Sequence, residues 1–492
     1  MPEESAFAGA PENGLVEDMV EDAVEDAVED VAEDSAESRD AVEDVTAFED
    51  AAERQEASAR PAVLGARDTF PPRAYATRID ALYGPLPISR WAQALLDLTP
   101  FARLDGVSLS DAPGELLFRR PFPSRLAHSL GVYYLARQAR PRDRALHAAA
   151  LAHDLGHGPF SHLTEPLMIE RLGLDHERRG AIVLRRAFAQ ARGAAARLLT
   201  WLDLDEATAL MLGDGSGGRG QLLNGQLDYD NLDNVARFLQ AADLGDPTYD
   251  PPTLARELRL LPPDAADSDD GVAEPSLALA YDAEAQARAW LSDRRRMYRF
   301  LGEGERNLAM RGMLRKAIDL ATQVGMIADD FFDMTDAQAL RLLGAGSSSG
   351  AAMLAEAVAC DELYMTAWEA LAPESARALA QVFAQSDARL AIEERVAMEA
   401  GLLPYEVVLS YVVARGERSL PPLLAPERGR AEPAQSQPAA SRAPIGLAAP
   451  ERRIVLSVTR RLGRDYARRA RMAAERALGS LGAVPHAGSD LH

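Results

Sequence analysis

The chain has 492 residues, of which 47% are hydrophobic and 6% aromatic, so it can bury a sizeable core and divide into roughly two to four domains. Its formal net charge of −23 comes mostly from residues 1–60, which hold 21 acidic and 3 basic residues. The remainder is close to neutral, so nucleic acid is a possible partner but not a favoured one. There is no apolar run of about 18 residues, so we expect no membrane span. The N-terminus lacks a basic segment followed by an apolar one, so we expect no secretory signal. The single cysteine, Cys360, excludes an internal disulfide and fits a cytoplasmic protein.

The N-terminal segment is an acidic stretch of low complexity. Residues 14–34 repeat Val, Glu, Asp and Ala with a period of four, which drifts around a helix of about 3.6 residues per turn. Dense like charge also opposes compaction. We therefore predict that residues 1–65 form a disordered acidic tail, which either keeps the protein in solution or binds a partner.

Apolar periodicity predicts a mainly helical fold from about residue 66 onwards. Ser89 is suited to capping a helix that continues to Leu98. We divide this part into a core over residues 66–260 and a helical extension over residues 261–420. The longer helices are predicted at 127–139, 143–154, 164–172, 177–203, 227–242 and 284–325, and further helices are predicted to fill 335–402.

The C-terminal part is predicted to contain a small β region. Tyr405–Val413 and Ile454–Val458 are rich in β-branched residues, which favour strands. Arginines on a predicted helix over 464–478 could meet nucleic acid or the acidic tail, and we favour packing and contact with the tail. The remaining divisions are a Pro- and Ala-rich linker over 421–450, a strand and basic helix over 451–482, and a disordered tail over 483–492.

Six of the eight histidines lie between residues 128 and 176, and histidine is the commonest metal ligand. An Ala- and Leu-rich helix runs into His153-Asp154, where both side chains can reach one ion placed beyond the helix end. His128 lies 25 residues upstream, on another predicted helix. If the two helices are antiparallel, His128 lies near the end that carries His153-Asp154. A carboxylate-dense segment around Asp230 can supply a further ligand. Imidazole and carboxylate together suit a divalent ion such as Mn, Mg, Fe, Ni or Zn.

These motifs closely resemble those of the HD-domain deoxynucleoside triphosphate triphosphohydrolases over roughly residues 70–420. The resemblance implies an all-helical HD core with a small β-containing C-terminal part, a nucleotide substrate, and an enzyme that works as a homo-oligomer. It also implies metal ligands at His128, His153, Asp154 and Asp230, active-site histidines at His157, His162 and His176, and a phosphate-binding arginine at Arg125. The residues that carry it are Arg125-Leu-Ala-His128, His153-Asp154-Leu-Gly-His157-Gly-Pro-Phe-Ser-His162, His176-Glu177 and Asp230-Asn-Leu-Asp233-Asn-Val-Ala-Arg237.

The chemistry of phosphoester hydrolysis explains why these residue types belong together. A bound metal lowers the pKa of its water and polarises a phosphoryl oxygen. His162 or His157 could protonate the leaving oxygen. Arg125 could clamp phosphate oxygens, and His176 could orient phosphate or another histidine. His147 matches no such position, so we predict a core histidine, and we predict that Asp228 and Asp233 support the site rather than bind the metal.

The aspartate motif departs from the family pattern at three positions. Family members that use dNTPs typically place Lys, Tyr and Asp where this chain has Asn231, Asn234 and Phe238. Phe238 cannot accept a hydrogen bond from a sugar hydroxyl. We predict substrate contacts at Arg125, Asn231, Asn234 and Arg237. Three functions stay open: a dGTP-like triphosphohydrolase, a 5′-nucleotidase or phosphodiesterase of the wider HD superfamily, and a catalytically weak nucleotide-binding assembly protein.

Overall fold

The computed structural model describes residues 76–118, 122–261, 276–346, 349–373, 375–413, 420–424 and 452–485. The chain separates into two units, Met1–Phe70 and Pro71–His492. All the described residues belong to the unit Pro71–His492. The predicted acidic tail 1–65, residues 425–450 of the predicted linker and residues 486–492 of the predicted C-terminal tail lie outside the described residues. Within the described ranges, no helix is both long enough and apolar enough to cross a membrane.

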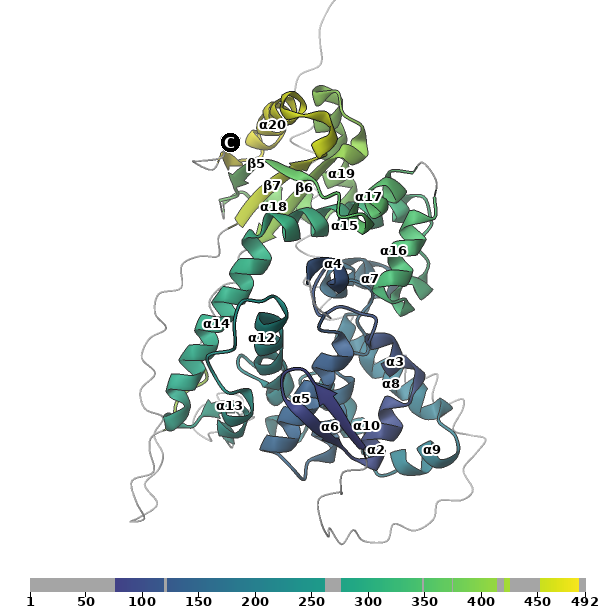
Figure 1. The fold of residues 1–492 in the computed structure, drawn as a ribbon, viewed down its shortest axis with the longest axis vertical. Helices are drawn as coiled ribbons and strands as arrows, with labels where there is room; N and C mark the ends of the chain where they lie inside the picture. The colour runs from purple at the N-terminus through teal and green to yellow at the C-terminus, as the bar shows by residue number, and fades with distance from the viewer. Residues whose placement is uncertain are drawn as a thin grey trace, which may run out of the picture. The chain divides into compact units, whose positions relative to one another are not determined.

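The fold is mainly helical with a few small sheets, as predicted (Figure 1). At the centre of its first part α5 packs against α6 and α12. Every residue of α6 from Leu146 onwards is buried, which is why that helix is apolar on all sides. The elements of this part are β1 (Ala76–Asp80), β2 (Gly84–Ile88), α2 (Arg90–Leu96), α3 (Thr99–Leu104), α4 (Gly114–Leu117), α5 (Arg125–Ala139), α6 (Arg144–Ala152), η1 (Ser161–Leu163), α7 (Glu165–Leu172), α8 (His176–Gln190), α9 (Gly193–Leu199), α10 (Leu204–Met211), η2 (Ser216–Gly218), α11 (Gln221–Asn224), α12 (Tyr229–Ala241), α13 (Pro251–Glu257), β3 (Leu258–Leu261) and β4 (Ser276–Leu279).

A second group of helices follows in the chain and has its own apolar core. The long helix α14 packs against α12, and α15 continues from it after Gly304, whose extended backbone separates the two helices. Phe331 and Phe332 are fully buried between α15 and its neighbours. The elements are η3 (Tyr281–Ala283), α14 (Glu284–Glu303), α15 (Glu305–Gln323), η4 (Asp329–Asp333), α16 (Asp336–Gly344) and α17 (Gly350–Ala359).

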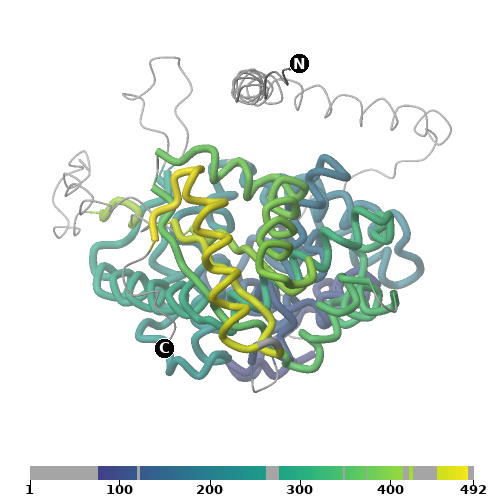
Figure 2. Tube along the Cα trace, turned by 90° about the horizontal axis from the view of Figure 1, so that it is seen from above, coloured from purple at the N-terminus to yellow at the C-terminus, as the bar shows by residue number. Residues whose placement is uncertain are grey.

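The C-terminal part is a four-stranded sheet in the order β6-β7-β5-β8, covered by helices. Strand β7 pairs antiparallel with β6 and with β5. Helix α20 buries alanines from Ala467 to Ala477 and leaves most of its arginines exposed, and it lies beside α19, as Figure 2 shows in yellow and green. The elements are β5 (Met365–Leu371), α18 (Arg377–Ala384), α19 (Ser386–Ala400), η5 (Pro404–Glu406), β6 (Val407–Val413), β7 (Arg452–Val458), η6 (Arg460–Leu462), α20 (Arg464–Gly479) and β8 (Val484–Pro485).

Several predicted elements are confirmed. Ser89 caps α2 by accepting a hydrogen bond from the backbone N–H of Ala92. Strands β6 and β7 and helix α20 form where the residue patterns placed them.

Other predictions are wrong in instructive ways. Residues 177–203 form two helices, α8 and α9, because Gly193 adopts a left-handed backbone conformation that breaks the run. Helices do not fill 335–402, since β5 lies within that range. Its partner β7 follows more than 80 residues later, so the pairing leaves little local signal.

Candidate metal centre

Three helices deliver the predicted metal ligands to one place. His128 lies in the first turn of α5, which Ser124 caps. His153 is the C-cap of α6, and Asp154 follows it, as the sequence predicted. Asp230 lies in the first turn of α12. The ligands are therefore held at helix ends, where side chains from neighbouring helices can meet around a point beyond the termini.

The ligand atoms of His128, His153 and Asp230 all lie within 4.8 Å of one another. His128 Nε2 is 2.8 Å from Asp230 Oδ1 and 3.3 Å from His153 Nε2. Asp154 borders this group, with carboxylate oxygens 3.6 Å from His153 Nε2 and 3.8 Å from His128 Nε2. The Asp230 side chain is 32% exposed, whereas that of His128 is fully buried, so the group opens towards solvent on the Asp230 side.

The hydrogen bonds behind the two histidines turn their Nε2 atoms towards each other. His128 Nδ1 donates to Asp233 Oδ2 at 2.7 Å, and His153 Nδ1 donates to the carbonyl of Ala150 at 3.0 Å. Each ring therefore directs Nε2, its remaining ligand atom, towards the Asp230 carboxylate. Ligand atoms at such short range are stable together with a cation among them, either a proton on Nε2 or a metal ion. This donor set fits a divalent metal ion, with Asp154 as a fourth ligand within reach.

The same carboxylates control the charge of His128 when no metal neutralises them. Burial lowers the pKa of His128, but the hydrogen bonds to Asp230 and Asp233 outweigh burial and raise it to about 9. A metal ion and a proton consequently compete for Nε2 at neutral pH.

Asp233, which we predicted to support the site, is itself locked in place. Arg237 Nε and Nη2 donate to its two oxygens at 2.8 and 2.9 Å, and Arg237 Nη1 donates to Asp80 at 2.9 Å. The Arg237 side chain is only 4% exposed. A substrate contact at Arg237 stays a prediction, and the observed role of this side chain is to orient Asp233 and, through it, His128.

Helix α5 approaches this ion-pair network very closely. A Cβ on Gly131 would lie 1.9 Å from Asp233 Oδ1, so only glycine fits there. Asp80, which no sequence motif indicated, reaches the network from the end of β1.

Arg125 contacts the metal centre rather than open solvent. Its Nη1 donates to both oxygens of Asp154, at 3.0 and 3.1 Å, and its Nε donates to Ser161 Oγ at 2.9 Å. Burial raises the pKa of Asp154, but Arg125 and His153 outweigh burial and hold it well below its usual range. Asp154 therefore stays ionised beside the metal ligands.

The three remaining predicted histidines form a second cluster. The rings of His157 and His176 stack with centroids 3.9 Å apart, and the ring of His162 meets that of His157 edge-on at 4.7 Å. Gly156 allows this approach, because a Cβ there would lie 1.8 Å from the His176 carbonyl oxygen. Phe160 and Ser161 both have positive φ, a strained turn that brings His162 back towards His157.

Glu165 was missed by the sequence analysis and connects this cluster. It accepts hydrogen bonds from Nδ1 of His162 at 2.8 Å and from Nδ1 of His176. Burial lowers the pKa of His176, but Glu165 and Glu177 outweigh burial and raise it. The H-x-x-E spacing of His162 and Glu165 in the sequence was the signal that could have found this residue.

His157 is the buried member of the cluster. Burial lowers its pKa well below the usual value, and the positive charges of Arg125 and His176 lower it further. Within the described residues neither ring nitrogen has a partner at hydrogen-bond geometry, although Nε2 lies 3.3 Å from Asp154 Oδ1. His157 therefore stays neutral beside Asp154.

A cavity of about 210 Å³ is lined by Arg125 and His162, and none of the four predicted metal ligands is among its lining residues. Asn234 and Phe238 line it as well, and Arg125 and Asn234 are predicted substrate contacts. Asn231 is not among the lining residues, because its amide donates to the carboxylate of Asp228, the N-cap of α12.

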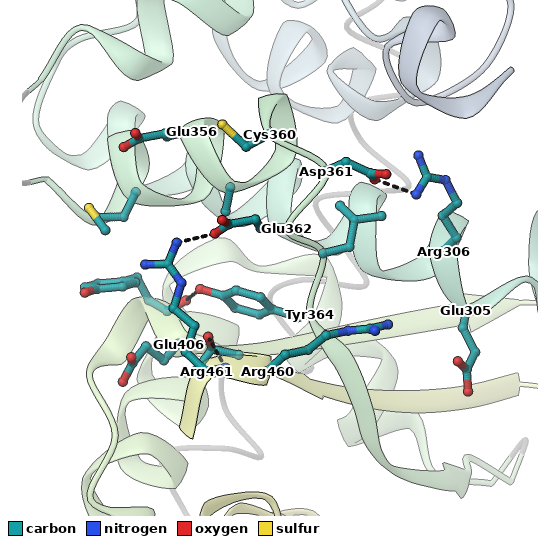
Figure 3. Close-up of a pocket in the computed structure, with 15 residues that line it drawn as sticks. Glu305, Arg306, Glu356, Cys360, Asp361, Glu362, Tyr364, Glu406, Arg460 and Arg461 are labelled. Atoms are coloured by element: carbon teal, nitrogen blue, oxygen red, sulfur yellow. Dashed lines mark hydrogen bonds and ion pairs between the residues drawn. The ribbon is translucent and has the colours of Figure 1, made fainter. Parts of the chain in front are cut away.

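A larger cavity of about 870 Å³ lies elsewhere and contains no predicted site residue among its lining side chains (Figure 3). Two of its arginines pair with its carboxylates, Arg306 with Asp361 and Arg461 with Glu362. His147 is a core residue, as predicted. Its Nε2 lies 2.8 Å from the carbonyl of Arg140, and its ring is buried against Trp91.

Residues 125–246 match the family model described as the HD domain. The segment begins at Arg125 and includes the whole metal centre, the histidine cluster and α12. The match supports placing this segment in the HD superfamily and supports metal-dependent phosphohydrolase chemistry in general, without distinguishing substrates.

Metal affinity should rise with pH. His128 is protonated below about 9 in the metal-free protein, so binding displaces a proton, and this group alone makes affinity rise about tenfold per pH unit between pH 6 and 8. Calorimetric titration with Mn²⁺ at several pH values measures this dependence. Asp233→Asn should weaken binding by about 10–100-fold, and His147→Phe, a buried histidine outside the site, should leave it unchanged. A pH-independent affinity would contradict the assignment of His128.

Glu165→Gln should lower kcat for phosphoester hydrolysis by about 10–100-fold with little change in KM, because both histidines lose the carboxylate that orients them. The limb of the pH profile that reports His176 should move to lower pH, since Glu165 is what raises its pKa. Glu170→Gln, an exposed change on the same helix, is the control. An unchanged pH profile in Glu165→Gln would assign Glu165 a purely structural role.

Proposed function

We propose that this chain is a metal-dependent phosphohydrolase that cleaves deoxynucleoside triphosphates, dGTP-like, to the deoxynucleoside and triphosphate. The observation that carries the proposal is the convergence of His128, His153 and Asp230 on a point that could hold a metal ion, next to a cluster of three histidines. The HD-domain match over residues 125–246 supports the hydrolase class.

The side chains around the centre have complementary roles in this reaction. A bound divalent ion supplies Lewis acidity and lowers the pKa of a water molecule. Asp154 and Asp230 offset its charge. Arg125, held by Asp154 and Ser161, presents guanidinium N–H groups at the cavity wall, where they can donate to phosphate oxygens.

Proton transfer falls to the histidine cluster. His162 is 39% exposed and lines the cavity, and Glu165 fixes its Nδ1, so its Nε2 is free to donate a proton to a leaving sugar oxygen. His157 stays neutral between Arg125 and His176 and can accept or donate without bringing a third positive charge.

The cavity also suits the nucleoside part of such a substrate. Beside its cationic groups it is lined by apolar and aromatic side chains, including Phe238, Phe383 and Tyr411. Flat aromatic walls with a few charged groups are typical of sites for nucleobases and phosphates.

A second candidate function follows from two positions on α12 that offer no polar group to a substrate. Asn231 is tied to Asp228, and Phe238 packs edge-on against Phe118 and Phe300. A monophosphate or another phosphoester needs fewer polar contacts at these positions, so 5′-nucleotidase or phosphodiesterase activity is the alternative. A catalytically weak nucleotide-binding protein is the third, and the intact histidine cluster argues against it.

The assay is incubation of metal-loaded protein with each dNTP and each deoxynucleoside monophosphate, followed by product analysis. We expect triphosphate release from at least one dNTP, lost by about 10³-fold or more in Asp230→Asn, because the metal no longer binds. The control is Asp243→Asn, an exposed carboxylate just after α12. Inorganic phosphate from monophosphates, with no triphosphate from any dNTP, would replace the proposal by the nucleotidase alternative.

A further inference from the structure

One wall of the cavity is formed by residues outside the HD segment and carries several guanidinium groups. Arg311 and Arg315 come from one face of α15, and Arg389 comes from α19. Strand β6 contributes Ser410 to the same wall. All four residues lie outside residues 125–246, so the HD match assigns them no role.

The charges of this wall do not balance. Of the four arginines that line the cavity, three face a carboxylate: Arg125 faces Asp154, Arg311 faces Asp111 at 2.9 Å, and Arg389 faces Asp319. The nearby Lys316 is neutralised by Glu393 at 2.8 Å. Within the part of the chain that the structure describes, Arg315 has no carboxylate partner.

Arg315 is held among like charges by a shared neutral acceptor. Its Nη2 donates to the carbonyl of Phe383 at 3.3 Å, and Arg389 Nη1 donates to the same oxygen at 3.4 Å. Burial lowers the pKa of Arg315, and the charge of Arg389 lowers it further, while Asp319 opposes this shift. A guanidinium that lies near two others and makes no ion pair of its own within the described residues is stabilised when an anion joins them.

Two further donors in this wall also lack partners. Ser410 Oγ and Arg311 Nε are buried and make no hydrogen bond to any residue that the structure describes. A buried unpaired donor is destabilising, so native structures seldom keep several together without a ligand. An anion with several acceptor oxygens would satisfy both donors and Arg315 at once.

We propose that Arg311, Arg315 and Ser410 form a phosphate subsite that binds the phosphoryl groups of a nucleotide polyphosphate beyond the one that reacts at the metal centre. This inference rests on the proposed function and deepens it, because it makes the length of the phosphate chain a determinant of specificity. Arg315 supplies the unpaired charge, and its planar fork suits bidentate contact with phosphate oxygens.

The first test measures anion binding without catalysis. Calorimetric titration with inorganic tripolyphosphate, in protein freed of divalent metal, reports anion binding by the protein's own side chains. We expect Arg315→Gln to weaken binding by about tenfold or more, and Ser410→Ala to weaken it less, since a charged donor contributes more than a neutral one. The control is Arg460→Gln, which removes the same charge from the wall of the larger cavity in Figure 3. Binding that is lost in Arg460→Gln and kept in Arg315→Gln would overturn the proposal.

The folding of the variants provides an internal check. Arg315→Gln removes crowded positive charge, so the anion-free variant should melt no lower than the wild type. Tripolyphosphate should raise the melting temperature of the wild type and raise that of Arg315→Gln much less. An equal rise in both proteins would contradict the subsite. If Arg315→Gln does not fold, Arg315→Lys keeps the charge but loses the fork, and intermediate binding is expected.

The second test uses turnover. Arg315→Gln should lower the ratio of kcat/KM for a deoxynucleoside triphosphate over that for its monophosphate by about tenfold, mainly through the KM of the triphosphate. An equal loss for both substrates would mean that Arg315 only supports the fold. If no nucleotide is hydrolysed at all, the proposed function fails, and the tripolyphosphate titration still decides whether the subsite exists.

Discussion

The hydrogen bond between His128 and Asp233 is the constraint on which the rest of the site depends. Asp233 fixes a proton of His128 on Nδ1, so Nε2 faces Asp230 and His153, where a metal ion can replace the proton on Nε2. Asp233 can do this because Arg237 and Asp80 hold it from the other side. The chain of contacts runs from β1 through α12 to α5. The packing of these elements therefore determines how the ligand atoms are oriented.

Much of this arrangement could be predicted from the sequence, because it is carried by local motifs. His153-Asp154 at the end of an Ala-rich helix and Asp230 at the start of another are short-range signals, and the helices formed there. Strand β5 and Asp80 could not be predicted, because β5 depends on a partner far along the chain and Asp80 contributes only through Arg237. Glu165 lay within a recognisable spacing from His162 and was overlooked because a carboxylate at a helix start has an ordinary explanation as a capping charge.

The metal centre and the arginines of α15 have different tasks in the proposed reaction. The metal centre would bind the reacting phosphoryl group through the ion held by His128, His153, Asp154 and Asp230. Helix α15, which follows the HD segment, would supply positive charge for the other phosphoryl groups of the substrate. The contacts of Arg315 follow from its three-dimensional position among Arg311, Arg389 and the cavity. Sequence spacing alone cannot show which arginines share a carboxylate and which do not.

X-ray absorption spectroscopy of the protein loaded with one equivalent of Zn²⁺ would show whether His128, His153 and Asp230 bind the metal. We expect a coordination shell with two imidazole nitrogens at about 2.0–2.1 Å and carboxylate oxygens. We also expect one imidazole contribution to be lost in His128→Ala. A shell made only of oxygen, or a spectrum unchanged by His128→Ala, would contradict the metal centre at α5, α6 and α12.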